Sequence, residues 1–386
     1  CNYVLENDYW LKVEINCELK CICNFIPRPK KKIIEDNGFY KIQKNCLTCF
    51  MKGGKSRDIF LYSKDLLKRD WIKDLGIEYY CSEDMYDYLE RFISFQFEHI
   101  EEELIYTHIG WRNIQEKMVY LHGNGAIGLK SNKHICGNKD KVIECINITS
   151  YQAINESLKL LAISDDLSKT LLMFLFSHLS VVRELFVQAG AEPKFCLWIY
   201  GLTGSMKTSV SKVFFNIFNT GKKQDITATF KDTIAAIEMK SFEYKDSVLL
   251  VDDFHPTISS QEKKEMQRLA SEMLRRYGDY ICRSRATKDM NRQKIYPPRG
   301  LCVITGEDKI GGESTVARYI SIEVKPGDFK SQELAYFQNN SCIFSTHIYY
   351  FIEWISNNFV SLKEYIKQQF IEIRNENINN FRHGRM

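Results

Sequence analysis

The chain has 386 residues, enough for two or three domains of ordinary size around a large buried core. Hydrophobic residues make up 44% of it and charged residues 26%, a composition that excludes a disordered chain, a collagen and a coiled coil. Its 53 Lys and Arg residues against 49 Asp and Glu residues give a net charge of +4. That balance does not indicate a general polyanion binder, although it leaves room for a local basic patch.

Thirteen cysteines scattered along a chain of this length are more typical of reduced thiols than of a secreted disulfide framework. No secretory signal opens the chain, so a cytoplasmic location is expected. The first residue is Cys1 rather than Met, which favours a piece of a longer protein. The most apolar stretch, 167–189, contains Lys169, Arg183 and Glu184. These charges favour a helix buried in a core over a membrane span, and no membrane partner is expected.

Residues 1–150 carry short apolar runs at 9–15, 20–26 and 118–121, separated by turns rich in Gly, Asn and Lys. This pattern predicts a mainly β N-terminal domain. A stripe of apolar residues at helical spacing predicts a helix over 82–97.

From about residue 151 the pattern changes to strands that alternate with helices. It predicts an α/β fold with a parallel sheet and crossover helices. We expect a core domain over 151–330 and a C-terminal helical region over 331–386. The expected strands are 195–200, 247–251, 301–305 and 319–324, and the expected helices of the core are 151–189, 208–218 and 261–277.

The segment 201–209 has the sequence GLTGSMKTS and lies between an expected strand and an expected helix. Backbone N–H groups of such a loop, with a helix N-terminus behind them, form a cradle for phosphate. The P-loop pattern G-x-x-x-x-G-K-[ST] is matched, except that Met206 stands where the second glycine is expected. A chance strand–turn–helix is the alternative. The residues predicted to bind ATP are Gly201, Thr203, Gly204, Ser205, Met206, Lys207, Thr208 and Ser209.

Within this loop, Lys207 is expected to reach the β- and γ-phosphates, and the Thr208 hydroxyl is expected to bind Mg²⁺. The strand predicted at 247–251 ends in Asp252 and Asp253. A parallel strand beside the P-loop strand would bring Asp252 to the same Mg²⁺, and Asp253 would then polarise the attacking water. The alternative is an ordinary polar exit from a strand. Many ATPases of this kind use Glu at this position. Asp253 departs from them because its side chain is shorter.

Two further residues follow the next strands. Thr305 ends the strand predicted at 301–305 and is expected to contact the attacking water or the γ-phosphate, the role called sensor 1. Arg318 immediately precedes the strand predicted at 319–324. In a ring-shaped oligomer an arginine there can act as an arginine finger in the ATP site of the neighbouring subunit. The alternative is a surface or salt-bridged arginine.

A basic segment lies between the Asp252 strand and the Thr305 strand. Residues 261–300 hold eleven Lys and Arg residues against five Asp and Glu residues. Such a patch predicts binding of nucleic-acid phosphates largely without sequence recognition, whereas a solvated charged face is the alternative. The residues predicted to bind DNA are Arg283, Arg285, Lys288 and Arg292.

Three other features are open to a functional and a structural interpretation. Cys21 and Cys23, with Cys46 and Cys49, could supply four thiolates to zinc, but the Cys-x-Cys spacing is unusual and the flanks look like strands. The Gly-Trp-Arg segment at 110–112 is more typical of a turn and core anchor than of a ligand site. His255 follows the acidic pair, and a structural role is favoured over contact with phosphate or a neighbouring subunit.

Four segments occur together in one order, and they resemble a known family. They are THIGWR at 107–112, YLHGNGAIG at 120–128, the loop 201–209, and YPPRG at 296–300 followed by TGE at 305–307. Over roughly residues 20–330 the chain resembles the ATPase domains of replication proteins of phages, plasmids and chromosomal islands, long catalogued as a domain of unknown function. Their better-understood members are similar to minichromosome-maintenance-like AAA+ helicases.

This resemblance implies a P-loop AAA+-like ATPase core in a ring-forming, homo-oligomeric motor that uses ATP and Mg²⁺ and moves on single-stranded DNA. It favours the arginine-finger role of Arg318, and it implies that the basic segment faces a central channel. It also fits a looser loop around Met206. A nucleotide-dependent switch or scaffold that does not move DNA is the alternative function. A primase or loader domain upstream of Cys1 is a further possible partner.

Overall fold

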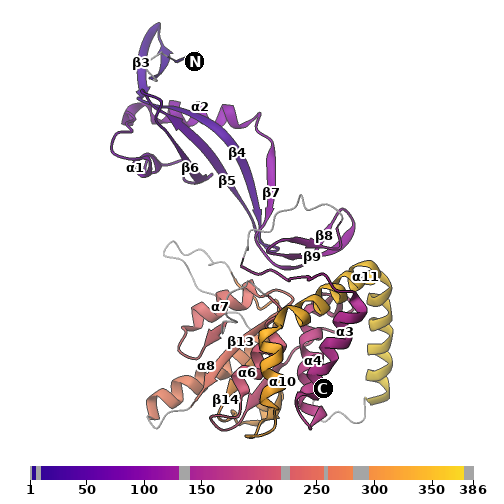
Figure 1. Ribbon diagram of the computed structural model, residues 1–386. Helices are drawn as coiled ribbons and strands as arrows, with labels where there is room; N and C mark the ends of the chain where they lie inside the picture. Colours follow the sequence, from indigo (N-terminus) through magenta and orange to yellow (C-terminus); the bar gives the residue numbers. More distant parts are fainter. Residues whose placement is uncertain are drawn as a thin grey trace. The chain divides into compact units, whose positions relative to one another are not determined.

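The computed structural model describes residues 2–5, 10–129, 140–218, 227–255, 260–280 and 295–377. The chain divides into two compact units, Cys1–Thr107 and His108–Met386 (Figure 1). The predicted domains 1–150, 151–330 and 331–386 do not coincide with these two units, and as functional domains they stay a prediction. In the structure, residues 108–127 and the C-terminal helices belong to the same compact unit as the parallel sheet.

The first unit consists of two sheets and a small helical layer. Its strands are β1 (Asn2–Leu5), β2 (Leu11–Ile15), β3 (Glu18–Cys23), β4 (Ile26–Asp36), β5 (Lys41–Phe50), β6 (Ser56–Tyr62) and β7 (Glu102–Tyr106). Its helices are α1 (Trp71–Leu75), the short 3-10 helix η1 (Glu83–Met85) and α2 (Tyr86–Phe97). Strands β1 to β3 form an antiparallel sheet, and the second sheet has the order β6-β5-β4-β7, in which only β7 runs parallel to its neighbour.

The helical layer covers one face of the β6-β5-β4-β7 sheet. Helix α2 buries Leu89, Ile93 and Phe97, which recur every four residues, in a core that includes Leu47 and Leu61 of the sheet. The helix predicted over 82–97 is therefore confirmed, except that its first turn is a 3-10 helix. The apolar runs predicted as strands in this unit correspond to β2 and β3.

The second unit contains a three-stranded antiparallel sheet, a five-stranded parallel sheet and the remaining helices. Its strands are β8 (Gly110–Ile114), β9 (Lys117–His122), β10 (Gly125–Ile127), β11 (Cys196–Tyr200), β12 (Ala228–Thr229), β13 (Val248–Phe254), β14 (Leu301–Gly306) and β15 (Tyr319–Glu323). Its helices are α3 (Ser150–Leu158), η2 (Lys159–Ile163), α4 (Leu167–Val181), α5 (Arg183–Gln188), α6 (Lys207–Phe215), α7 (Ile234–Glu243), α8 (Ser260–Asp279), α9 (Glu313–Val316), α10 (Ser331–Asn339) and α11 (Ser341–Asn377).

The parallel sheet has the order β12-β13-β14-β11-β15, so the first strand along the chain, β11, lies inside the sheet. Successive side chains of β11 point to opposite faces. Leu197 and Ile199 lie in one core with residues of α4, α6 and α11, whereas Cys196 and Trp198 lie in a second core with residues of α7 and α8. Because helices cover both faces (Figure 1), the strands are continuously apolar, and this is why the sequence shows them as unbroken runs.

The predicted α/β fold, with N-terminal β-sheets, a parallel sheet and C-terminal helices, is confirmed. The stretch 167–189 forms α4 and α5, and α4 buries residues such as Met173 and Phe176 in the core. No helix in the described part of the chain is both long and apolar enough to cross a membrane.

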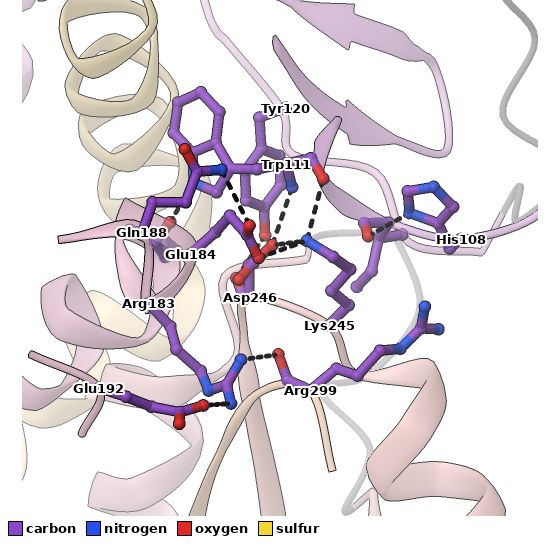
Figure 2. A network of polar contacts seen from close by, with 12 residues as sticks. His108, Trp111, Tyr120, Arg183, Glu184, Gln188, Glu192, Lys245, Asp246 and Arg299 are labelled. Carbon is purple, nitrogen blue, oxygen red and sulfur yellow. Dashed lines mark hydrogen bonds and ion pairs between the residues drawn. The ribbon is translucent and has the colours of Figure 1, made fainter. Parts of the chain in front are cut away.

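The segment around Trp111 anchors β8 to the turn before β13 and to the end of α4 (Figure 2). Its backbone N–H donates to Asp246 Oδ2 at 2.9 Å, and its indole N–H donates to the Val181 carbonyl at 2.6 Å. Gly110 has a φ of +87°, and a Cβ there would lie 2.6 Å from the same Asp246 oxygen. Trp111 is 2% exposed, so the interpretation of this segment as a turn and core anchor is confirmed.

The four cysteines considered for zinc lie on β3 and β5. Cys23 and Cys49 belong to the core beneath α2, and burial raises the pKa of both thiols, that of Cys49 to about 12. Burial therefore disfavours the thiolate form that binds zinc. Among the described residues, no group of three or more His, Cys, Asp and Glu side chains is arranged to hold a metal ion.

Candidate active site

The loop 201–209 connects the carboxyl end of β11 to the first turn of α6, as a phosphate-binding loop requires. Gly201 passes so close to the next strand that a Cβ would lie 1.9 Å from the Val324 carbonyl oxygen. Gly204 has a φ of +83° and open space around it. Met206, which stands in the place of a glycine, also has a left-handed conformation, with φ +66° and ψ +16°.

This conformation costs a residue with a Cβ about 1–2 kcal/mol, which a glycine would not lose. The Met206 side chain packs against the main core of the second unit, and that contact offsets part of the cost. Met206 therefore adopts the backbone conformation that a glycine would have at this position. The absence of the second glycine is not an obstacle to this turn.

Lys207 is folded back on its own loop. Its Nζ donates to the carbonyl oxygens of Gly201 at 2.7 Å and Leu202 at 2.9 Å. Burial lowers the pKa of Lys207, although the carboxylates of Glu307 and Asp252 act in the opposite direction. The ammonium group thus lies at the mouth of the loop, held by neutral acceptors that an anionic phosphate can replace.

Three oxygen-bearing side chains meet beside the loop. Thr208 donates its hydroxyl to Asp252 Oδ1 at 2.9 Å, and Thr305 donates its hydroxyl to the same oxygen. Asp252 lies on β13 and Thr305 on the adjacent strand β14, so the parallel pairing brings both to the carboxyl edge of the sheet. Hydroxyl and carboxylate oxygens are the donors that Mg²⁺ prefers, so Thr208 and Asp252 fit a site for this ion.

Asp253 lies at an irregularity in β13. The register between β13 and β14 shifts between Val251 and Phe254, and Asp253 has a φ of +70°. A β-bulge of this kind turns a side chain out of the alternation of the strand, and an Asp tolerates the left-handed conformation better than a branched residue. Asp253 is exposed and lines the same cavity as Lys207.

Glu307 is a site residue to which the sequence analysis assigned no role. It follows β14, accepts a hydrogen bond from the Thr203 hydroxyl and forms an ion pair of 2.5 Å with His255 Nδ1. The hydrogen bond from Thr203 and the neighbouring His255 hold the pKa of its carboxyl below the usual range. This acid lies two residues after Thr305, which the alternation of strand side chains could have indicated.

These groups surround a cavity of about 290 Å³ at the carboxyl edge of the parallel sheet. Ligands of open α/β sheets bind at this edge. The lining residues are Thr203, Gly204, Met206, Lys207, Thr208, Ser209, Asp252, Asp253, Thr305, Gly306 and Glu307. Gly201 and Ser205 lie within the loop, where Ser205 is buried and donates to the Leu202 carbonyl at 2.7 Å.

Arg318 lies at the amino ends of the parallel strands, opposite the ends that carry the cavity. It precedes Tyr319, which pairs with Cys196 at the start of β11, five residues before the loop begins. Five residues of strand span about 16 Å. The guanidinium is buried and donates from Nη2 to Asp279 Oδ2 at 2.8 Å, at the end of α8. The structure therefore places Arg318 away from the cavity of its own chain that Lys207 and Asp252 line.

The predicted DNA-binding residues Arg283, Arg285, Lys288 and Arg292 lie outside the described residues. The described residues next to them are Tyr280, after α8, and Ile295, before β14.

Comparisons with known proteins agree with this architecture. No model of a protein family matches the chain. No curated protein matches it either. Among solved structures, the SCCmec type IV Cch active helicase is 11% identical in sequence, with a TM-score of 0.59 over 99% of this chain and 70% of that chain. The chain therefore shares the fold of that helicase structure.

Two structures of the JCV helicase also match over part of the chain. The inhibitor-bound form is 12% identical, with a TM-score of 0.32 over 58% of this chain and 62% of that chain. A second structure is 12% identical, with a TM-score of 0.30 over 57% and 62% of the two chains.

Proposed function

We propose that the second unit binds and hydrolyses ATP with Mg²⁺, and that the protein is a ring-forming helicase or translocase on single-stranded DNA in mobile-element replication. The observation that carries the proposal is the convergence on one cavity of the loop 201–209 with Asp252, Asp253 and Thr305, which come from three separate segments. A lysine, a threonine and two acids at the carboxyl edge of a parallel sheet are the parts of a P-loop ATPase.

Each residue of the cavity has a separate role in this proposal. Lys207 would exchange the Gly201 and Leu202 carbonyls for phosphate oxygens, so its charge stays compensated when the nucleotide binds. Thr208 and Asp252 would hold Mg²⁺, which neutralises charge that develops between the β- and γ-phosphates. Thr305 fixes the orientation of Asp252 through its hydroxyl.

Two carboxylates are candidates for orienting the attacking water. Asp253 is turned into the cavity by the β-bulge. Glu307 contacts Thr203 of the loop and His255 after β13, so its position depends on both segments. We assign the base to Asp253 and a positioning role to Glu307 and His255.

Arg318 bears on the choice between the two candidate functions. An arginine at the opposite edge of the sheet from its own cavity can serve only the nucleotide of another copy, if it serves one at all. Its pairing with Asp279 in the same chain favours the second candidate function, a nucleotide-dependent switch or scaffold, because a purely structural arginine needs no neighbour. Strand displacement separates the two candidates.

The test combines three measurements on the full chain: ATP hydrolysis with and without single-stranded DNA, displacement of a strand from a forked duplex, and negative-stain imaging with an ATP analogue. The proposal expects hydrolysis that DNA stimulates, displacement that needs ATP, and closed rings. Nucleotide binding without displacement or rings would overturn the motor in favour of the switch. Absence of nucleotide binding would overturn both.

A further inference from the structure

We propose that the open face of the β6-β5-β4-β7 sheet in the first unit binds single-stranded nucleic acid. The helical layer covers one face of this sheet, which carries Leu47 and Leu61. On β5 and β6, directly opposite residues share a face. The pairs Lys44 with Tyr62 and Cys46 with Phe60 therefore lie on the other face, called here the open face. This inference concerns a different unit from the ATP cavity and does not rest on the proposed function.

The open face presents aromatic rings to the surface. Phe60 is 60% exposed and Tyr62 is 38% exposed, and they lie two residues apart on the edge strand β6, about 7 Å along the strand. Phe50 on β5 lies on the same face, opposite Ser56, and is partly exposed. Large exposed rings on an open sheet indicate a binding surface, and rings in a row allow successive bases of a single strand to stack on them.

Cations lie beside these rings. The Arg28 guanidinium lies 5.7 Å from the centre of the Phe50 ring, and the ammonium groups of Lys44 and Lys64 lie 5.3 Å and 5.7 Å from the centre of the Tyr62 ring. Within the described part of the chain, neither Arg28 nor Lys64 forms an ion pair, whereas Lys44 pairs with Glu35 at 2.8 Å. Rings that hold bases, next to cations that hold phosphates, are the combination that single-stranded nucleic acids require.

An irregularity in β4 adds further charge to the open face. The register of β4 with β5 shifts between Pro29 and Lys31, so that Lys30 and Lys31 are both directed to this face. Lys30 reaches Asp58, at 2.5 Å, and Lys31 reaches Glu103, at 3.0 Å. Both pairs are about half exposed, and ion pairs of this kind are weak enough for phosphates to replace the carboxylates.

The distribution of charge decides which partner fits. Residues 26–64, which form β4 to β6, hold ten Lys and Arg residues against three Asp and Glu residues. Residues 65–107, which form the helical layer and β7, hold four against twelve. The unit is thus basic on the strands that carry the rings and acidic elsewhere. This asymmetry favours a polyanion with flat apolar groups over a protein partner or a second copy of the chain.

The experiment measures binding of the full chain, without ATP, to fluorescent dT20 and rU20 by anisotropy. Replacing Phe60 or Tyr62 with Ala removes one stacking platform, so each variant is expected to bind about tenfold more weakly. Phe60→Trp keeps a ring and is expected to bind as the wild type does. Phe95→Ala is the matched control, because Phe95 is 65% exposed on the helical layer. The rU20 arm shows whether the face distinguishes RNA from DNA.

Cross-linking separates this face from other basic segments of the chain. Single strands that contain 5-bromodeoxyuridine, irradiated in complex with the protein, are expected to label Tyr62 or Phe60, and peptide mass spectrometry identifies the site. Arg28→Ala is expected to reduce the salt slope of binding by about 0.7. Unchanged affinity in both Ala variants, with labels only outside 26–64, would overturn the proposal. A change in oligomeric state without a change in affinity would instead assign the face to a second copy.

Discussion

Lys207→Ala tests the phosphate-binding role of the loop most directly. Without nucleotide, Nζ makes two hydrogen bonds within 3 Å, to the Gly201 and Leu202 carbonyls. Both bonds already involve the charged ammonium, and replacing a neutral carbonyl by an anionic phosphate oxygen turns each into a stronger bond between opposite charges. At about 1–1.5 kcal/mol for each exchange, ATP binding gains about 2–3 kcal/mol. The variant is expected to bind ATP about 30- to 150-fold more weakly.

Turnover is expected to fall further than binding, because the charge on the transferred phosphoryl group is spread over oxygens that Lys207 would contact. Release of inorganic phosphate at saturating ATP measures turnover, and a fluorescent ATP analogue measures affinity. Lys212→Ala is the matched control, since Lys212 lies on the same helix but outside the cavity. Retention of more than about a tenth of the wild-type turnover, a barrier change under about 1.4 kcal/mol, would refute the assignment.

Three further predictions follow from the same structure. Asp253→Asn is expected to lower turnover by about 10²-fold or more with little change in ATP affinity; a larger loss in Glu307→Gln would move the base to Glu307. Burial lowers the pKa of His347 to about 3, so the unfolded chain takes up its proton near pH 6.5 and the folded chain does not. His347 alone therefore lowers the stability by about 1.4 kcal/mol between pH 7.5 and pH 5.5, and denaturant unfolding of His347→Phe is expected to show a loss smaller by that amount. Buried His108 and His122, whose pKa values are lowered to about 3 and about 4, keep their own contributions in the variant. Gly110→Ala is expected to destabilise the protein by more than about 2 kcal/mol, because the added Cβ would meet the buried carboxylate of Asp246. Gly190 also has a positive φ, +78°, but open space around it, so Gly190→Ala is expected to show only the cost of the strained backbone. Equal thermal shifts in the two variants would refute the steric reason.

The strands and the loop of the parallel sheet could be predicted from the sequence because their signals are local. Strands covered on both faces show as unbroken apolar runs, and 195–200 corresponds to β11 within one residue. The expectation that the Asp252 strand lies beside the P-loop strand was wrong, because β14 lies between β13 and β11. Thr208 nevertheless contacts Asp252, since all parallel strands of the sheet end at the same edge. The exception is α6, which begins at Lys207 and ends at Phe215, earlier than predicted, because no sequence signal marks its end.

The link between Thr203, Glu307 and His255 could not be predicted, because its three residues belong to segments that only the strand order brings together. The contact of Trp111 with Asp246 joins residues 135 positions apart, and nothing local to either residue indicates it. The conformation of Met206 was also hidden. A pattern match treats the missing glycine as a departure, whereas the backbone adopts the left-handed conformation and packs the side chain in the core.

Arg318→Ala separates a role in a neighbouring subunit from a structural role. If Arg318 only pairs with Asp279, the variant leaves a largely buried carboxylate without its partner, and it is expected to unfold about 3–5 kcal/mol more easily, with turnover lowered only through unfolding. If Arg318 acts as an arginine finger, turnover is expected to fall about 10³-fold in a protein that still binds ATP. Hybrid oligomers decide between the two. In a mixture with Lys207→Ala, some interfaces combine an intact loop with an intact arginine, so the finger role expects activity to return. A mixture that forms hybrid rings, as native mass spectrometry shows, and yet stays as inactive as its parents would assign Arg318 to the ion pair alone.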